Sequence, residues 1–287
     1  MLATQKRERF RRILQGAKVE YTTSVFDAIS ARIADSLGAK VGILGGSIAS
    51  AAVLAAPDLV VMTLSELTDQ VRRITRAGNI SLMVDADHGY GNALNSMRTV
   101  EELEEAGVSA LSLEDTSLPI SFRGDKHPAL IPKEEMVGKL KAALKARRDP
   151  SLVIIGRTSA LTFVSHQETM DRIEAYAAVG VDAIMLLGIK SLDQLEEARK
   201  VTGLPIVLGG TPAGLGTESE LTAAGVRLVL TGHQPFFVAM KALHDAMRHL
   251  KEGGTSQDLH SLIAPKELVD SVLGAEGHRQ WIEEYMQ

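Results

Sequence analysis

The sequence predicts an α/β protein folded as a (β/α)8 barrel of the TIM type. Eight runs of strand length recur along the chain, amphipathic helical stretches separate them, and most of these stretches end at a glycine. Strands that alternate with helices form a parallel sheet, and glycine commonly ends a helix. Eight such units in about 250 residues fit a closed barrel better than an open doubly wound sheet.

The predicted strands are mostly apolar, as strands covered on both faces are. They are residues 20–23, 41–44, 81–84, 110–113, 152–155, 183–187, 205–208 and 227–230. No GxGxxG motif follows the first strand, and the glycines of "GILGGS" have the wrong spacing for a dinucleotide-binding turn.

The predicted helices between these strands cover residues 27–38, 65–78, 96–107, 133–148, 165–180, 191–203 and 218–225. An amphipathic helix at the amino terminus, with Phe10, Ile13 and Leu14 on its apolar face, is expected to cover one end of the domain. A helix over 237–253 follows the last strand. We expect residues 1–287 to form one domain, with a helical extension from about residue 256 that packs outside its own barrel or against a neighbouring subunit.

The composition excludes several classes of protein. With 287 residues and 45% hydrophobic content the chain can bury a large core, and the absence of cysteine excludes disulfides, thiolate metal sites and cysteine catalysis. The net charge is -5, and positive and negative residues are interspersed along the chain, so the sequence shows no basic patch of the kind that binds nucleic acid. No apolar run approaches the roughly 20 residues that span a bilayer. We therefore expect a cytoplasmic protein that binds a small molecule and neither nucleic acid nor a membrane.

In a barrel of this type the active site lies at the carboxyl ends of the strands. The residues that follow the predicted strands are chemically consistent with one site. They are Gly45, Gly46 and Ser47 after the second strand, Asp85, Asp87 and His88 after the third, Glu114 and Asp115 after the fourth, Arg157 after the fifth and His233 after the eighth.

Four carboxylates can converge at these strand ends. Asp85 and Asp87 are two residues apart, so in extended backbone both would point to the same side of the sheet. Glu114 and Asp58 would approach the same region, and together the four would repel one another without a cation. Oxygen ligands without thiols favour Mg²⁺, or Mn²⁺ in its place, over Zn²⁺. A turn or a helix cap is the alternative reading of the aspartate pair taken alone.

Polar groups that suit a substrate lie at the same strand ends. The guanidinium of Arg157 matches a substrate carboxylate, although a salt bridge to Glu114 or Asp115 is an equally simple use for it. Ser47 and the amides near Gly46 can donate to a carboxylate or carbonyl oxygen. His233 is the histidine best placed to face the carboxylates, and His88 and Tyr90 would orient ligands or pack beneath the loop.

Several segments resemble the isocitrate lyase and phosphoenolpyruvate mutase superfamily, and within it most closely the oxaloacetate decarboxylase family. They are "SVFDAISARIADSLGAKVGILGGSIAS", "APDLVVMTLSEL", "DADHGYGNALNSMRTVEELEEAGVSALSLEDT", "GRTSA" and "LTGH". The resemblance implies a (β/α)8 barrel, a Mg²⁺ ion, an α-keto acid substrate and a homotetramer that exchanges its last helix between subunits.

Carried over by motif, the resemblance implies site roles. Asp85 would ligate Mg²⁺ directly, Asp87, Glu114 and Asp58 would hold it through water, and Ser47, Gly46, Arg157 and His233 would bind substrate, with Asp85, Arg157 and His233 as the catalytic set. The implied reaction is decarboxylation of oxaloacetate, or a close α-keto dicarboxylate, to pyruvate and CO₂ through a metal-stabilised enolate.

Two alternatives remain open. One is a C–C or P–C lyase of the same superfamily, of the 2-methylisocitrate, dimethylmalate or phosphonopyruvate type, with Lys126 or His127 as acid. The loop "PISFRGDKHPALIP" lacks both the cysteine of the lyases and the gating-loop residues of the mutases and hydrolases. The other alternative, of a different class, is a non-catalytic ligand-binding barrel.

Overall fold

The computed structural model describes residues 1–120, 129–210 and 214–286, and the predicted barrel is present within them. All paired strands are parallel, in the order β1-β9-β8-β7-β6-β5-β4-β3-β2. The strands are β1 (Glu20–Tyr21), β2 (Thr23–Ser24), β3 (Val41–Leu44), β4 (Ser81–Asp85), β5 (Ala110–Glu114), β6 (Val153–Thr158), β7 (Ala183–Leu186), β8 (Ile206–Leu208) and β9 (Val226–Val229).

The barrel closes through its first extended stretch. β1 pairs with β9 and β2 pairs with β3, and only Thr22 separates the two short strands. The Thr22 amide donates to the Val229 carbonyl at 3.0 Å, which continues the pairing through the break. The eight predicted strands are therefore confirmed, with the first divided in two.

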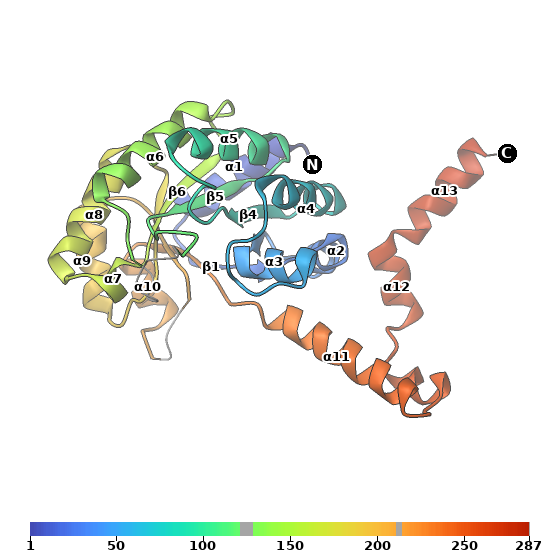
Figure 1. Ribbon diagram of the computed structural model, residues 1–287. Coiled ribbons are helices and arrows are strands. Elements are labelled where there is room, and N and C mark those ends of the chain that lie inside the picture. The colour runs from blue at the N-terminus through green and yellow to red at the C-terminus, as the bar shows by residue number, and fades with distance from the viewer. Residues whose placement is uncertain (121–128, 211–213, 287) are drawn as a thin grey trace.

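Helices surround the sheet (Figure 1). Those within the described ranges are α1 (Ala3–Gln15), α2 (Ala28–Ser36), α3 (Gly46–Leu54), α4 (Leu64–Ala77), α5 (Ala93–Glu105), α6 (Lys133–Ala146), α7 (Ala160–Phe163), α8 (His166–Ala178), α9 (Leu192–Thr202), α10 (Glu218–Ala223), α11 (Gln234–Lys251), the 3-10 helix η1 (Ser256–Leu262), α12 (Lys266–Leu273) and α13 (Ala275–Tyr285). The seven helices predicted between strands are all present. The short helices α3 and α7, at the carboxyl ends of strands, were not predicted.

The core has two layers, as a barrel requires. Side chains such as Ile43, Met83 and Ile155 fill the barrel interior, and a larger cluster lies between the strands and the helices. Phe10 and Leu14 of α1 belong to the interior cluster, so this helix closes the bottom of the barrel as predicted.

Helix α1 is also held at the bottom by its basic side chains. Lys6 Nζ donates to the carbonyls of Thr75 and Gly78, and Arg7 Nε donates to the Val108 carbonyl at 2.9 Å. These carbonyls lie just before strands β4 and β5, at the end of the barrel opposite the carboxyl ends. Helix α1 thus covers the bottom of the barrel, and the carboxyl ends of the strands at the top remain open.

The helices after β9 form a C-terminal arm, residues 234–286, that leads away from the barrel (Figure 1). The arm returns to α2 at one place, where Arg32 Nη1 donates to the Val272 carbonyl at 3.0 Å. None of the helices described here is long and apolar enough to cross a bilayer.

Candidate active site

A pocket of about 420 Å³ opens at the carboxyl ends of the strands, where the site was expected. It gathers nearly every residue that the sequence singled out: Ser47, Asp58, Asp85, Asp87, Glu114, Arg157 and His233 all line it. Gly46 lies directly behind the wall, against the Asp87 carboxylate. Lys126 and His127 lie outside the described residues.

Arg157 is the cation at the centre of these acids. Its Nη1 bonds to Asp85 Oδ2, its Nη2 lies 3.4 Å from Glu114 Oε2, and its side chain is only 14% exposed. Burial by itself would lower the pKa of the guanidinium, but the two carboxylates outweigh that effect and raise it. Arg157 is therefore charged at any ordinary pH. It forms the salt bridge to Glu114 that the sequence allowed, and pairs with Asp85 instead of Asp115.

The other carboxyl groups experience mutual repulsion. Burial, and then the charges of Asp85 and Glu114, raise the pKa of Asp87 well above 3.8. Burial also raises the pKa of Glu114, against the opposing charge of Arg157, and burial and Asp85 raise the pKa of Asp58. One arginine does not neutralise four acids, so the pocket favours a further cation.

Asp87 reaches the pocket by a different route from the one its spacing suggested. Strand β4 ends at Asp85, and Asp87 has a φ of 45°, so the extended backbone assumed for the pair is wrong. The turn is fixed because the Glu114 amide donates to the Asp87 carbonyl at 2.9 Å. A Cβ atom on Gly46 would lie 2.5 Å from Asp87 Oδ1, so the first residue of α3 must be glycine.

Neighbouring hydroxyl groups orient the acids, and these groups were not predicted from the sequence. Ser112 Oγ donates to Asp85 Oδ1 at 3.2 Å, and Thr116 Oγ1 donates to Glu114 Oε2 at 2.6 Å. Both lie on or beside β5, where alternate residues share one face. The alternation Ser112, Glu114, Thr116 was the signal that could have found them.

Asp115 has a separate role outside the pocket. Its side chain is completely buried and accepts bonds from Thr158, Tyr176 and Arg172. The Ile131 amide donates to the Asp115 carbonyl at 2.8 Å. This network joins β5, β6 and α8 and anchors the chain at Ile131, and thereby holds Glu114 and Arg157 in register.

His88 and Tyr90 pack beneath the loop that follows β4. Their ring centroids are 5.9 Å apart, and His88 is buried. Burial, and secondarily Lys139, lowers the pKa of His88 to about 4, so this imidazole is neutral near pH 7. The pocket lining does not include either ring, so both support the loop from behind.

Part of the remaining wall of the pocket is apolar. Met185 and Leu187 from β7 and its end, Leu230 after β9 and Phe163 of α7 contribute to this part. Such a wall excludes water and strengthens charge interactions within the pocket. The pocket therefore combines a charged lining, which favours a further cation, with apolar side chains.

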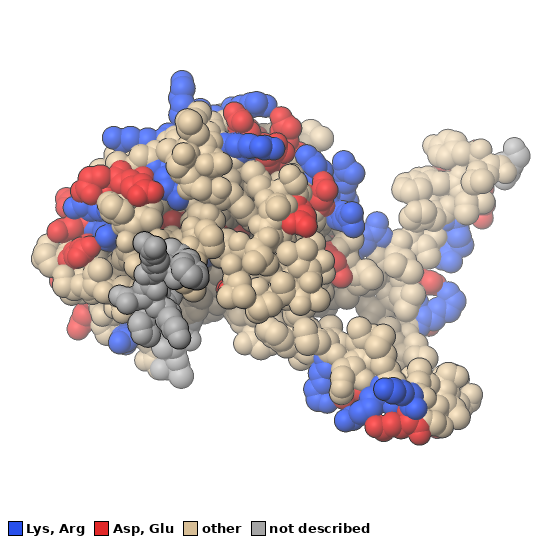
Figure 2. Space-filling model, viewed as in Figure 1, with Lys and Arg blue, Asp and Glu red and all other residues tan. Residues whose placement is uncertain are grey.

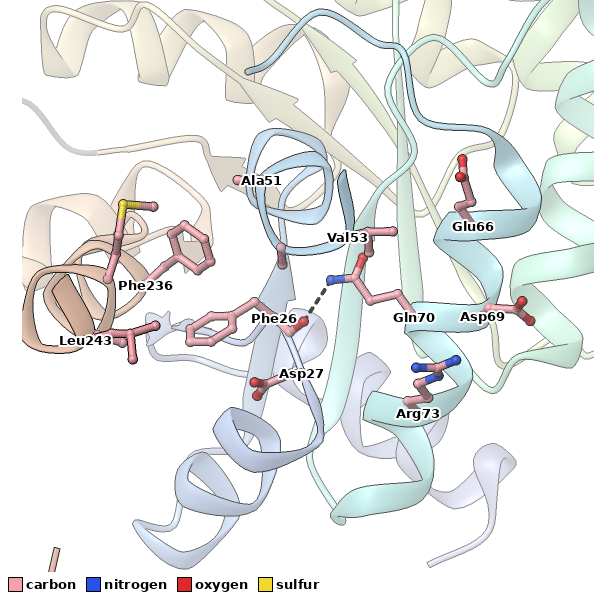
Figure 3. Close-up of a pocket in the computed structure, with 13 residues that line it drawn as sticks. Phe26, Asp27, Ala51, Val53, Glu66, Asp69, Gln70, Arg73, Phe236 and Leu243 are labelled. Atoms are coloured by element: carbon pink, nitrogen blue, oxygen red, sulfur yellow. Dashed lines mark hydrogen bonds between the residues drawn. The ribbon is translucent and has the colours of Figure 1, made fainter. Parts of the chain in front are cut away.

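A second hollow, of about 620 Å³, lies between α3, α4 and the start of α11 (Figure 3). Phe26, Phe236 and Leu243 line one side of it, and Gln70 Nε2 donates to the Phe26 carbonyl at 2.7 Å. It lacks the convergent charges of the strand-end pocket. Because residues at the start of the arm line this hollow, we connect the hollow with packing of the arm.

The fold and the pocket together define a (β/α)8-barrel enzyme whose carboxylates surround a single arginine at the carboxyl ends of the strands. The sequence model of one family, described as phosphoenolpyruvate phosphomutase, matches residues 10–251. The chain belongs to that family.

Relatives and solved structures agree with this assignment. An oxaloacetate decarboxylase of Bradyrhizobium diazoefficiens is 49% identical over 273 residues, which cover 95% of this chain and 94% of that protein. A phosphonopyruvate hydrolase in complex with oxalate and Mg²⁺ superposes with a TM-score of 0.85 at 28% identity and covers all of both chains. An oxaloacetate acetylhydrolase bound to 3,3-difluorooxalacetate gives a TM-score of 0.83 at 25% identity, covering 98% of this chain and 97% of that one.

Proposed function

We propose that this enzyme decarboxylates oxaloacetate, or a close α-keto dicarboxylate, to pyruvate and CO₂ with the help of Mg²⁺. The observation that carries the proposal is the pocket itself, in which Asp58, Asp85, Asp87 and Glu114 surround Arg157. The 49% identity to an oxaloacetate decarboxylase over 95% of the chain supports this reaction in particular.

The donor set fits Mg²⁺. All candidate ligands are carboxylates, there are no thiols, and within the described ranges no three His, Asp or Glu side chains converge closely enough to enclose a metal by themselves. Mg²⁺ commonly binds through one or two carboxylates and keeps several waters. Asp85 would be the direct ligand, and Asp87, Glu114 and Asp58 would hold ordered water around the ion. Mn²⁺, with similar ligand preferences, would substitute.

Several polar residues of the pocket have a use in this reaction. The C3–C4 bond of the substrate breaks, C4 leaves as CO₂, and the electron pair remains on the pyruvate enolate, which takes a proton from solvent at C3. Mg²⁺, when bound, supplies positive charge near the keto oxygen. One carboxylate of the substrate is held by Arg157, by Ser47 and by the first amides of α3. His233 contacts a substrate oxygen. No covalent nucleophile is needed.

The amino-acid sequence gives less support to the lyase alternative than to decarboxylation. Its usual acid, a cysteine, is absent from the whole sequence. The similarity to phosphonopyruvate hydrolase keeps P–C cleavage as an outcome to be tested. A panel of oxaloacetate, 2-methylisocitrate, dimethylmalate and phosphonopyruvate separates these reactions.

The decisive experiment measures pyruvate formation from oxaloacetate against the rate that Mg²⁺ produces without enzyme. We expect Asp85→Ala to lower kcat/KM by roughly two orders of magnitude, the scale on which one electrostatic stabiliser acts. Asp69→Ala, at an aspartate 64% exposed on α4, is the matched control and should keep full activity. Failure of the wild-type protein to bind either Mg²⁺ or oxalate in calorimetry would favour the non-catalytic barrel.

We also propose that the enzyme is a homotetramer whose subunits exchange their C-terminal arms. Exposed apolar side chains run along the arm: Phe237, Val238, Met240, Leu243, Met247, Leu250, Leu268, Val269, Leu273, Trp281, Ile282 and Tyr285. Surfaces of this kind mark protein contacts. The hollow beside α11 in Figure 3 would receive the arm of a second copy. The boundary near residue 256 and the cytoplasmic location stay predictions of the sequence.

A further inference from the structure

His233 is held by its inner ring nitrogen, Nδ1, and its outer nitrogen, Nε2, lies beside Gly45 in the wall of the pocket. His233 Nδ1 lies 2.7 Å from Ser24 Oγ, at the end of β2. Nε2 lies so close to Gly45, the residue between β3 and α3, that a Cβ atom on this glycine would sit 2.6 Å from it. Gly45 and His233 both line the pocket that holds Asp85 and Arg157. The outer nitrogen is thus the one that a bound substrate would meet.

The burial of Ser24 decides which nitrogen carries the proton. Ser24 is only 4% exposed, and among the described residues the hydrogen bond to His233 Nδ1 is the one its hydroxyl makes. If Nδ1 donated the bond, the hydroxyl proton would be buried without an acceptor, which is unfavourable. The hydroxyl therefore donates to Nδ1, and the imidazole proton resides on Nε2.

The substrate requires the same arrangement. An α-keto dicarboxylate presents only acceptor oxygens along its polar edges, so a lone pair on Nε2 would be repelled, whereas an N–H would donate. Burial also lowers the pKa of His233, against the charge of Asp85, which keeps the ring neutral near pH 7. A neutral ring with its proton on Nε2 has no lone pair that faces the substrate.

We propose that Ser24 is a positioning residue that fixes His233 with its proton on Nε2, so that His233 donates a hydrogen bond to a substrate oxygen and does not act as a general base. This inference rests on the proposed function for the identity of the oxygen. The state of the ring itself can be measured without any substrate.

The first test is an NMR spectrum of protein labelled with ¹⁵N in its histidines, because protonated and unprotonated ring nitrogens have well-separated shifts. The His233 signals are identified by their loss in His233→Gln. We expect wild-type His233 to carry its proton on Nε2, and Ser24→Ala to shift it toward a mixture of both forms. Ser109→Ala, at a buried serine whose hydroxyl has no partner in the described chain, should change nothing. A proton on Nδ1 in the wild type would overturn the proposal.

The second test uses kinetics with oxaloacetate and Mg²⁺. We expect Ser24→Ala to lower kcat/KM about tenfold. His233→Gln keeps an N–H donor near the position of Nε2 and should therefore retain more activity than His233→Glu. When Ser24→Ala is added to His233→Gln, we expect little further effect on kcat/KM. Equal losses from Ser24→Ala in both backgrounds would contradict an action through His233. If wild-type protein does not decarboxylate oxaloacetate at all, the proposed function fails, and the spectrum still decides the role of Ser24.

Discussion

At the scale of single residues, the pocket depends on positions where backbone and side chain nearly touch. Gly46 begins α3, and its missing side chain leaves room for the Asp87 carboxylate. The backbone of Asp87 is held by its carbonyl, which accepts a hydrogen bond from the Glu114 amide. The position of the Asp87 side chain among the acids is therefore fixed by Gly46 and by this hydrogen bond.

We expect Gly46→Ala to push Asp87 out of position and weaken Mg²⁺ binding by about 10- to 100-fold, as loss of an outer metal contact does. Calorimetric titration with Mg²⁺ in the presence of oxalate measures this. Gly138→Ala, on α6 where an added Cβ would meet nothing within 4 Å, is the matched control. It should leave the affinity unchanged and raise the free energy of unfolding by about 1 kcal/mol.

The raised pKa of Asp87 predicts how stability varies with pH. A carboxyl group whose pKa is higher in the folded chain stabilises the fold fully below its ordinary value of 3.8, and this contribution is lost as the pH rises through the folded pKa. In chelator, urea unfolding should therefore give a falling free energy of unfolding from about pH 4 upward. Asp87→Asn should flatten this fall. An unchanged slope would show that Asp87 is not the group responsible.

The sequence predicted the charged residues of the pocket but not the residues that orient them. Asp85, Glu114 and Arg157 were recognisable because each follows or ends an apolar strand, where a charge is conspicuous. Ser24 lies in a polar stretch, and its partner His233 is 209 residues away in the chain. No local pattern marks such a pair, because only closure of the barrel brings β2 beside the end of β9.

At the scale of elements, helix α1 fastens the bottom of the barrel through charges that are mostly buried. Arg7 reaches Asp149 at 2.7 Å, next to the start of β6, and also bonds to the carbonyls of Val108 and Glu104. Asp149 in turn accepts bonds from Thr4 and Ser151. The helix thereby links the strands that carry Glu114 and Arg157 at their opposite ends.

We expect Asp149→Asn to lower the free energy of unfolding at pH 7 by about 1.5–3 kcal/mol, the range for hydrogen bonds to a charged group. Burial alone would raise the pKa of Asp149, but the bonds from Ser151, Arg7 and Thr4 outweigh it and hold the pKa well below 3.8. Its stabilisation is therefore present above pH 3.8 and lost as the pH falls toward the folded pKa.

Urea unfolding at pH 7 and in the acid range checks this prediction. The wild type should lose stability on acidification more steeply than Asp149→Asn does. Asp69→Asn, whose partner Arg72 is itself 38% exposed, provides the control, and it should resemble the wild type at both pH values. If the two variants behave alike, the bond between Arg7 and Asp149 contributes little.

The elements that the sequence did not predict are the short ones. Helix α3 begins immediately after β3 in "GGSIASAAVL", where two glycines and small residues gave no helical period. Burial of Ile48 and Ala49 against the barrel stabilises it instead. Tertiary contacts of this kind outweigh local propensity, and they are absent from a single sequence. The long amphipathic helices needed no such help to be recognised.

At the scale of the whole molecule, the C-terminal arm exposes many large apolar side chains to solvent. The face of its far end, around α13, that is seen in Figure 2 shows few charged side chains, although the helix itself carries Glu276, Arg279, Glu283 and Glu284. Trp281 is 57% exposed and Tyr285 72% exposed within one chain. The number of β/α units predicted the barrel, but amphipathic helices alone do not specify the surface that covers them.

We expect Trp281→Asp to dissociate the oligomer, because a charge placed in a buried apolar contact is not tolerated. Light scattering coupled to size-exclusion chromatography gives the mass directly. Gln280→Asp, one residue earlier on α13 and exposed, is the matched control and should keep the wild-type mass. A monomeric wild type, or a Trp281→Asp variant with the wild-type mass, would contradict exchange of the arm.

The ion pair between Arg157 and Asp85 gives the protein its own resident counter-ion at the place proposed for Mg²⁺. Proteins that rely on a metal as a structural staple unfold when it is chelated. Here the guanidinium already balances part of the acid charge, so Mg²⁺ bound as proposed would exchange one cation for another at Asp85. We therefore expect removal of Mg²⁺ to leave this carboxylate paired with Arg157 and not with an unbalanced charge.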